Sequence, residues 1–447
     1  MMLYLHWQNK RVVIMDTENK TKTSIQVRLS CFVMGLGQIA NRQIIKGVLY
    51  LLCLGLFLAY MFSFGINDLK GFFTLGTTEA DPWLGIKGDD SIMMLLRGMI
   101  AVSAIVAIVI IYINNIKDII HTEELKNKGK ALPSFTKALK KFLDRKFYVV
   151  ALAVPVTGVF IFNVIPIIFM ILIAFTNYGG DVIPPSLVDW IGLGNFKKIF
   201  TLGNIKSTFF KILGWNLIWA FASTALNYFG GLFLALLLNK KCVKGKTFWR
   251  AFPILAYAVP GFITLLAFKF MFSYGGPVNY YITMAGGKAV GFLGIDAGIK
   301  ARLIGLFVNA WISIPTSMLL ATGILSNMNT ELYEAAAIDG ATKWKQFVKI
   351  TLPFVIFSTT AVLITSFINN FNNFGVFYFL RGGLYMDGYF LASDTDLLIN
   401  WLYNLSIDNN YYGIGAAVSL IIFVITSVLS LTVYVRSAAF RKEDTFR

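Results

Sequence analysis

Charged side chains are scarce in this sequence. Asp, Glu, Lys and Arg together make up 14% of its 447 residues, whereas hydrophobic residues make up 57%. A soluble domain carries about 25% charged residues. The composition therefore excludes an ordinary soluble domain and indicates a protein that spans a membrane.

Cysteine and histidine are also rare. The three cysteines, Cys31, Cys53 and Cys242, have no paired spacing, and the two histidines, His6 and His121, lie far apart. Disulfide frameworks and metal sites need such residues in close, regular groups. We therefore expect no disulfide, no metal site and no catalytic residue in this chain.

Long apolar runs are abundant. A helix needs about 20 apolar residues to cross the hydrocarbon core of a bilayer. The polar stretch before the first run is too long for the n-region of a signal peptide, so no cleavable signal is expected. The predicted fold is an all-α polytopic membrane protein with about eight transmembrane helices. The eight runs are roughly residues 44–66, 92–115, 148–176, 212–238, 251–273, 303–325, 354–375 and 411–435.

The positions of the basic residues predict an orientation. With the N-terminus in the cytoplasm, 28 of the 40 Lys and Arg residues fall in cytoplasmic segments and 10 in outer loops, Arg302 and Arg381 among the latter. The 23 acidic residues divide almost evenly, so the bias follows the positive-inside rule. The net charge of +17 is therefore a topology signal, with both termini cytoplasmic, and not a nucleic-acid footprint. The cytoplasmic segments are 1–46, 116–146, 239–250, 327–352 and 436–447.

Two features are missing that a self-contained transporter would need. None of the predicted spans contains an acidic residue, although ion-coupled carriers usually place carboxylates inside the membrane. Gly245-Lys246-Thr247 resembles the end of a P-loop, but Lys240 stands where that motif needs glycine and no strand precedes it. The chain is therefore expected to have no ATPase site of its own.

One polar, alanine-rich loop separates the sixth and seventh apolar runs. We predict a helix over 331–338, which Gly340 can end, and Pro353 stands where the next segment begins. The small side chains of Ala335 and Ala336 allow close approach to a partner. The loop reads Glu334-Ala335-Ala336-Ala337-Ile338-Asp339-Gly340-Ala341 and finishes with Ile350-Thr351-Leu352-Pro353.

This arrangement resembles the EAA loop of ATP-binding-cassette importer permeases. In that family the loop forms two short helices that sit in a cleft of the ATPase subunit. The resemblance implies a type I importer permease fold, with a six-helix core at 147–440 and the EAA-like loop at 327–353. The alternative is a plain amphipathic linker between two spans. The implied coupling residues are Glu334, Ala335, Ala336, Asp339, Gly340, Ala341, Leu352 and Pro353.

Other segments are similar to MalF-type maltose/maltodextrin permeases, which also have two helices before the core. That similarity implies a cytoplasmic N-terminal segment at 1–43, two accessory helices with a basic cytoplasmic loop at 44–146, and a cytoplasmic tail at 441–447. The loop at about 177–211 is short, whereas enteric members carry a large insertion there, so the Gram-positive branch is favoured. The similar segments are 175–178, 192–196, 252–260, 308–311 and 369–374.

The resemblance also implies a sugar site near the middle of the membrane. Sugars are held by hydrogen bonds to their hydroxyls and by aromatic faces. Asn370 and Asn373 would share one helix face, and Pro260 would kink its span beside Tyr257. The alternative is that the asparagines only hold helices together. The implied sugar-contacting residues are Tyr257, Gly261 (in place of a serine), Asn309, Ser313, Asn370 and Asn373.

The resemblance as a whole implies a permease subunit of an ATP-driven, binding-protein-dependent importer of maltose or maltodextrins in a bacterial plasma membrane. The implied partners are a second, MalG-like permease, a MalK-like ATPase dimer, an extracellular maltodextrin-binding protein and membrane lipid. ATP and Mg would bind to the ATPase, and no cofactor is expected in this chain. Three alternatives stay open: the same type of permease for another oligosaccharide or a sugar phosphate, an ion-coupled sugar carrier, and a purely structural scaffold.

Overall fold

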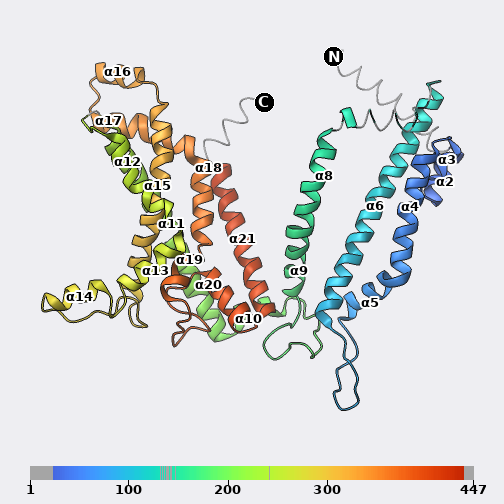
Figure 1. The fold of residues 1–447 in the computed structure, drawn as a ribbon, viewed down its shortest axis with the longest axis horizontal. Helices are drawn as coiled ribbons and strands as arrows, with labels where there is room; N and C mark the ends of the chain where they lie inside the picture. The colour runs from blue at the N-terminus through green and yellow to red at the C-terminus, as the bar shows by residue number, and fades with distance from the viewer. Residues whose placement is uncertain are drawn as a thin grey trace. The chain divides into compact units, whose positions relative to one another are not determined.

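A computed structural model describes residues 24–130, 132, 134, 136, 140, 143–145, 147–240 and 242–436 (Figure 1). Within these residues the regular structure is helical, apart from isolated β-bridges such as that between Asp81 and Ile86. The chain divides into two compact units. One comprises the residues up to Leu172 together with 181–190, and the other comprises 173–180 together with the residues from Ile191 onward.

The first unit contains three long helical segments that follow the first three apolar runs, preceded by the short helices α2 and α3. Asp90 starts the longest helix, because its carboxylate accepts hydrogen bonds from the backbone nitrogens of Ile92 and Met93. Two of the helices continue through single π-helical turns. The elements are α2 (Ile25–Phe32), α3 (Leu36–Ala40), α4 (Ile44–Tyr60), η1 (Met61–Gly65), α5 (Ile66–Thr74), α6 (Ser91–Asn127), α8 (Phe147–Val159), η2 (Phe160–Val164) and α9 (Ile165–Ile173).

The second unit is built around two long helices that pack along each other, α11 (Gly203–Asn239) and α15 (Gly298–Ser326). Gly231 permits this contact, since a Cβ there would lie 2.4 Å from the Ser317 side chain. The remaining elements are α10 (Gly194–Thr201), α12 (Lys246–Ala258), α13 (Gly261–Met271), α14 (Pro277–Met284), α16 (Glu331–Ile338), α17 (Lys343–Gln346), η3 (Phe347–Thr351), α18 (Leu352–Phe371), α19 (Gly375–Arg381), α20 (Leu398–Tyr403), η4 (Asn404–Asp408) and α21 (Tyr412–Arg436).

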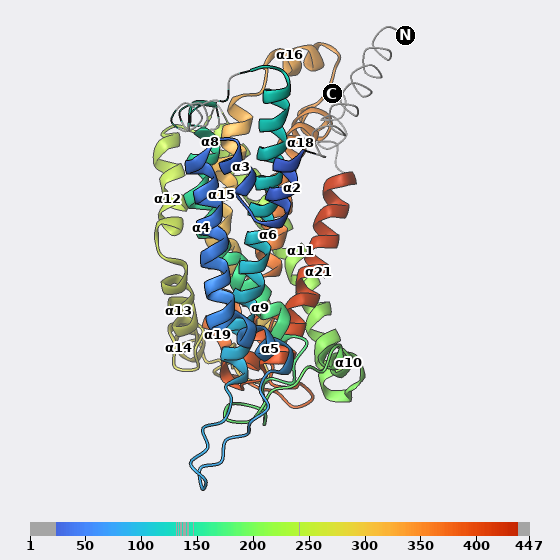
Figure 2. The same cartoon turned by 90° about the vertical axis from the view of Figure 1, so that its right-hand side faces the viewer.

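Two clusters of buried side chains hold this unit together. One joins α11, α15 and α19 through residues such as Trp219, Val308 and Phe377. The other joins α11, α15 and α18 through Tyr228 and Met318. Figures 1 and 2 place α16 at one end of the unit and α10, α14 and α20 at the other. The polar loop at 327–353 is therefore far from the loops on the opposite face.

The predicted number of spans is confirmed. Seven described helices are long and apolar enough to cross a membrane, and α12 with α13 forms an eighth if the two are counted as one broken span, bent by 89°. The break falls at Pro260, as expected, because proline cannot continue the hydrogen-bond ladder. All eight predicted runs thus correspond to helical segments.

The helices extend beyond the predicted apolar runs, because polar residues at their ends still form helical backbone hydrogen bonds. The second run was predicted to end at residue 115, whereas α6 continues to Asn127. Asp68, Asp118 and Glu123 consequently lie on helices that are candidate spans. These carboxylates lie beyond the predicted apolar runs, which themselves contain no acidic residue.

The predicted domain limits stay predictions. The described contacts separate the two units near residue 172, not at 147, and only Ile173 is buried between residues 147 and 173. Within the predicted N-terminal segment, residues 25–32 and 36–40 are helical. Residues 1–23 and the tail at 441–447 lie outside the described residues.

Candidate functional site

A cavity of about 450 Å³ lies between α11, α12, α15 and α18 of the second unit. Five of the six predicted sugar-contacting residues line it: Tyr257, Asn309, Ser313, Asn370 and Asn373. They come from three helices and the turn after α18, so the fold brings together positions up to 116 residues apart in the chain. The volume falls in the range of small-ligand pockets.

Asn309 of α15 is the centre of a chain of amide hydrogen bonds. Its Nδ2 donates to Asn370 Oδ1, and its Oδ1 accepts from Asn373 Nδ2, each at 3.3 Å. Asn370 in turn donates to Thr224 Oγ1 of α11 at 3.0 Å. These bonds link three helices, so the asparagines of this cluster do hold helices together, as the alternative interpretation predicted. The amides nevertheless line the cavity and retain further hydrogen-bonding capacity.

Asn370 and Asn373 do not share one helix face, contrary to the sequence-based expectation. α18 ends at Phe371, and Asn373 lies in the short break before α19. The reason is local: Asn373 Oδ1 accepts a hydrogen bond from Val376 N at 3.1 Å and caps the first turn of α19. Both residues reach Asn309 all the same.

Tyr257 lies on the last turn of α12, just before the 89° bend. The bend turns α13 away and leaves the Tyr257 ring exposed along the cavity wall. Gly261 starts α13 and is not among the residues that line the cavity. A Cβ at Gly261 would meet no other atom within 4 Å, so a larger residue would fit there without a clash.

Sequence reasoning missed part of the polar lining. Asn227 is the most informative of these residues, because its Oδ1 is buried and has no hydrogen-bond partner among the described residues. A pattern was available in the fourth apolar run, where polar residues recur at 223, 224, 227 and 228, a spacing that marks one helix face. The missed polar residues of the lining are Thr224, Asn227, Tyr228, Thr316, Ser317 and Ser366.

The lining is polar but uncharged. Among the described residues around the cavity, twelve carry hydroxyl or amide groups, and none is Asp, Glu, Lys, Arg or His. A charged ligand in a site of low dielectric constant needs an opposite charge. Hydroxyls and amides instead match a neutral polyhydroxylated ligand, since each can donate and accept hydrogen bonds.

The polar loop at the opposite end of α15 has the predicted helix. α16 spans Glu331–Ile338, and Gly340 follows with φ +76°, a conformation that favours glycine. Ala341 N donates to Ala336 O at 2.8 Å, which closes the helix end. The resemblance implied a second, separate short helix. Instead, α17 continues through η3 into α18, because the wide π turn precedes Pro353, whose missing N–H would break a regular α-helical ladder.

The coupling residues are placed on an accessible loop. Glu334, Ala335, Asp339, Gly340 and Pro353 are exposed, and the remaining three are partly exposed. Neighbouring apolar side chains are exposed as well, with Ile338 at 87% and Trp344 at 72% of their full surface. Tyr333 ties the loop to the span, because its hydroxyl lies 2.8 Å from Thr351 Oγ1.

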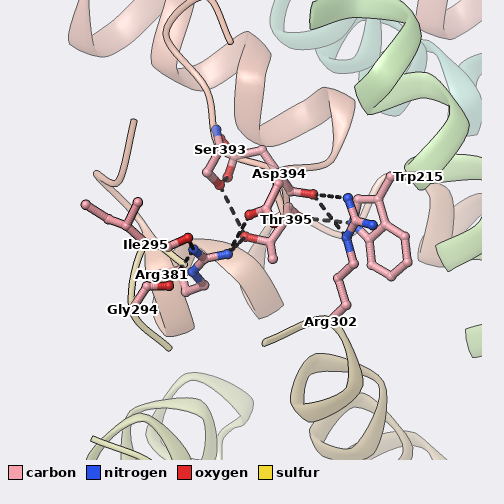
Figure 3. A network of polar contacts seen from close by, with 9 residues as sticks. Trp215, Gly294, Ile295, Arg302, Arg381, Ser393, Asp394 and Thr395 are labelled. Carbon is pink, nitrogen blue, oxygen red and sulfur yellow. Dashed lines mark hydrogen bonds and ion pairs between the residues drawn. The ribbon is translucent and has the colours of Figure 1, made fainter. Parts of the chain in front are cut away.

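A compact polar network lies beyond the other end of the core (Figure 3). Arg381, expected to be an ordinary outer-loop cation, is fully buried and pairs with Asp394 at 2.8 Å. It also donates to Thr395 Oγ1 and to the carbonyl oxygen of Gly294. Arg302 donates to the Asp394 carbonyl and lies over the Trp215 ring at 4.3 Å from its centre. These bonds fix the loop at 382–397 to α15 and α19.

Asp396 of the same loop is buried without a direct ion pair. Burial raises its pKa from 3.8 to about 6, against the opposing effect of hydrogen bonds from Ser393 and Asn404 and of the Arg381 charge. Its two oxygens accept from Ser393 N, Ser393 Oγ and Asn404 Nδ2. No group of three or more His, Cys, Asp or Glu residues in the described part of the chain is arranged to hold a metal ion.

Comparison with known proteins agrees with this architecture. Residues 227–442 match the family described as binding-protein-dependent transport system inner membrane component. The maltodextrin transport system permease protein MdxF of Bacillus subtilis is 34% identical over 435 residues, which cover 95% of this chain and 98% of that protein. The galactooligosaccharides transport system permease protein GanP of the same organism is 33% identical over 425 residues, covering 93% and 98%.

Other similarities are partial. The maltose/maltodextrin permease MalF of Vibrio vulnificus is 34% identical over 261 residues, which cover 57% of this chain and 50% of that protein. A solved bacterial ABC transporter that imports the acidic polysaccharide alginate superposes with a TM-score of 0.55 at 22% identity, covering 66% of this chain and 97% of that one. The latter likeness confirms the fold class. The relatives that match along almost the whole length confirm the family: this chain belongs to the inner-membrane components of binding-protein-dependent transport systems.

Proposed function

We propose that this chain is a transmembrane permease subunit of an ATP-driven, binding-protein-dependent importer of maltodextrins, and that it forms half of the translocation pathway. The observation that carries the proposal is the uncharged cavity lined by hydroxyl and amide groups between α11, α15 and α18. Maltodextrins are neutral and present many hydroxyls, which such a lining can bind without the cost of burying a charge. The name of the full-length relative MdxF supports the same sugar class.

The cavity also separates this proposal from its alternatives. A sugar phosphate would bring a negative charge to a wall where the described residues offer no cation. A proton- or sodium-coupled carrier would need a carboxylate or a comparable ligand beside the substrate, and the described lining has none. Galactooligosaccharides remain a second candidate, because they are equally neutral and the relative GanP matches almost as well.

The loop at 327–353 is proposed to couple the cavity to a partner ATPase. Exposed apolar side chains on a loop otherwise rich in charge, above all Ile338 and Trp344, are suited to a protein interface. Glu334 is exposed, and no cation of the described chain forms a salt bridge with it, so its charge is free for a partner. ATP and Mg would bind to that ATPase dimer, which supplies the energy that this chain does not.

A mechanical connection between the loop and the cavity follows the chain. α16 is tied to Thr351 through Tyr333, and α17, η3 and α18 follow one another without a break from Lys343 to Phe371. Movement of the loop would therefore shift α18 and the asparagines at its far end, and with them the opening of the cavity. A second permease would supply the opposite wall, and an extracellular binding protein would deliver the sugar.

The test is transport by the assembled system. The chain is co-expressed with its second permease and ATPase, reconstituted in liposomes, and supplied with a sugar-loaded binding protein and internal ATP. We expect uptake of labelled maltotriose that needs ATP hydrolysis and persists when an uncoupler collapses ion gradients. Uptake of labelled galactotriose in its place would transfer the proposal to the second candidate. Uptake that follows the ion gradient and not ATP would refute it.

A further inference from the structure

The short helix α2 carries an apolar face that nothing in the described chain covers. Ile25, Leu29 and Phe32 recur at helical spacing and keep 71%, 38% and 89% of their surface exposed. The opposite face is buried through Val27 and Ser30. If α2 lay in water, its Phe32 side chain would be almost completely exposed to solvent, although the other face of the helix is buried. Such an exposed apolar face usually marks contact with a membrane or another protein.

The depth of α2 is set by its contacts with α6. Tyr112 donates a hydrogen bond to the carbonyl oxygen of Cys31 at 3.0 Å, and Asn115 contacts the turn between α2 and α3. Tyr112 lies inside the apolar run of α6, whereas the ion pair between Asp118 and Lys46 marks its polar end. At 1.5 Å per residue, Tyr112 lies about 9 Å along α6 from Asp118 toward the hydrocarbon, and its hydrogen bond to Cys31 places the end of α2 beside this apolar part of α6.

The backbone of the turn between α2 and α3 is satisfied as a membrane interior would require. Away from water, non-helical N–H groups must find partners within the protein. Gly35 N donates to Asn115 Oδ1 at 3.2 Å, and Gly37 N donates to Ser30 Oγ at 3.0 Å. Ser30 donates in turn to Gln38 Oε1 at 2.9 Å. The side chains of Ser30, Gln38 and Asn115 are completely buried.

The two glycines of this turn are closely packed against neighbouring backbone. Gly35 has φ +90°, and a Cβ there would lie 2.2 Å from the carbonyl oxygen of Gly47 in α4. A Cβ on Gly37 would lie 2.1 Å from the Gln26 carbonyl oxygen. The turn thus packs against Gly47 of α4 and is bonded to Asn115 of α6, while Ile25, Leu29 and Phe32 of α2 stay exposed.

We propose that residues 25–41 form a helical hairpin embedded in one leaflet of the bilayer, with Ile25, Leu29 and Phe32 in contact with lipid acyl chains. The hairpin extends the exposed apolar surface of α4, which begins three residues later with Ile44 and Ile45. Arg28 and Arg42, both exposed, can reach the headgroup region. The proposal holds for either leaflet, so it depends neither on the transport function nor on the predicted orientation.

The native cysteines provide the test. Cys31 is exposed on α2, and Cys242 is exposed in the loop after α11. A nitroxide spin label is attached to the full-length chain in liposomes of phosphatidylethanolamine and phosphatidylglycerol, at Cys31 alone (with C53A and C242A) or at Cys242 alone (with C31A and C53A). A third label is attached at Leu56→Cys in a protein whose three native cysteines have been replaced by alanine. Leu56 is exposed on the apolar surface of α4 and serves as the reference for a lipid-facing position. Collision rates with dissolved oxygen, which enters lipid, and with a water-soluble nickel chelate are then compared.

We expect the oxygen-to-nickel collision ratio at position 31 to match that at position 56 and to exceed that at position 242 severalfold. A ratio close to that at 242 would show that α2 is in water and would overturn the proposal. Low collision rates with both reagents would show that protein covers the face, which would overturn it as well. In a second arm, Asn115→Ala leaves Gly35 N without a partner, and the label at Cys31 should become more accessible to nickel, whereas Asn114→Ala, at the exposed neighbouring position, should have no effect.

Discussion

Asn309 lies between Asn370 and Asn373, and this cluster has two roles that experiments must separate: it joins helices and it lines the cavity. Its hydrogen bonds with Asn370 and Asn373 join α15 to the end of α18. Inter-helical hydrogen bonds of this kind contribute about 0.6 kcal/mol each on average. The same amides face the cavity. A substitution can therefore lower uptake through lost sugar contacts, through weaker helix packing, or through both.

Tyr257→Ala should isolate the sugar-contacting role. No hydrogen bond holds the Tyr257 hydroxyl within the described chain, and its ring is exposed along the cavity, so truncation leaves the packing intact. We expect normal assembly, binding-protein-stimulated ATPase activity that is at least partly kept, and loss of most maltodextrin uptake per assembled complex. Unchanged uptake per complex would move the sugar site elsewhere.

Asn373→Ala should reduce uptake for a mixed reason. Each lost hydrogen bond to the sugar is worth about 0.5–1.5 kcal/mol, or roughly two- to tenfold in binding. The variant also loses the cap on α19, which costs about 1 kcal/mol. Asn216→Ala is the matched control, because Asn216 is fully buried and only joins α11 to Phe371 and Leu398. The control should lower the yield of complex with little effect on uptake per complex. Equal losses of yield and uptake in both variants would favour the helix-joining role.

Asn227→Leu should weaken sugar binding without weakening the fold. The unpaired Asn227 Oδ1 contributes no hydrogen bond within the described chain, and its replacement by an apolar group of similar size removes a buried polar atom that costs stability. We expect a thermal unfolding midpoint equal to or above that of the wild type, and a lower apparent affinity for transported maltodextrin. A fall in the midpoint together with unchanged transport would contradict the assignment of Asn227 to the site.

Asp396 should make stability depend on pH. Its pKa of about 6 in the folded protein exceeds the ordinary 3.8, so the cost of ionising it is absent below pH 3.8 and complete above pH 6. Stability should thus fall as pH rises from 4 to 6, by roughly 3 kcal/mol at most. In Asp396→Asn that dependence should disappear, measured as the unfolding midpoint in detergent from pH 4 to 7. The exposed Asp387 provides the control, Asp387→Asn. A difference between variant and wild type that stays constant with pH would contradict this account.

Among the elements, α16 is the one that the sequence predicted most closely. Its start and end at Glu331 and Ile338 follow from helix-forming residues before Gly340. The broken fifth span was predicted only in part: Pro260 indicated a kink, but a bend of 89° depends on the packing of α12 against α15 and of α13 against α19. The hairpin of α2 and α3 was not predicted, because its stabilising partner Asn115 lies 80 residues away in α6.

Gly340→Asp should uncouple the loop without preventing insertion. The φ of +76° costs a side chain about 1 kcal/mol or more, although the space around Gly340 is open. The altered end of α16 would misplace Glu334 and Ile338 relative to a partner. We expect normal amounts of protein in the membrane, loss of co-purification with the ATPase, and no uptake. Gly383→Asp, at a glycine with φ +82° in the loop at the opposite end of the unit, is the matched control and should keep the ATPase bound. Full transport by Gly340→Asp would remove the basis for the coupling role.

At the scale of the whole molecule, cysteine labelling can test the predicted orientation in the membrane. The distribution of basic residues predicts that 280–295 and 385–408 face outward and 120–145 face the cytoplasm. Single cysteines placed in the first two ranges should react with a membrane-impermeant maleimide added to intact cells. Cysteines in the third should react only after the cells are opened. The reverse pattern would invert the topology and place the loop at 327–353 out of reach of a cytoplasmic ATPase.

The membrane class, the number of helical segments, the helix α16 and the family could all be predicted from the amino-acid sequence. These properties depend on composition and on patterns within about 30 residues, which are readable along the chain. The roles of the individual polar residues depend instead on the packing of helices that are distant in the sequence. Arg381, counted as an outer-loop cation, is buried against Asp394, and Asn227 proved to be an unpaired group in the cavity. The physical reason is that a buried polar group is defined by its partners, and these partners come from other helices far away in the sequence.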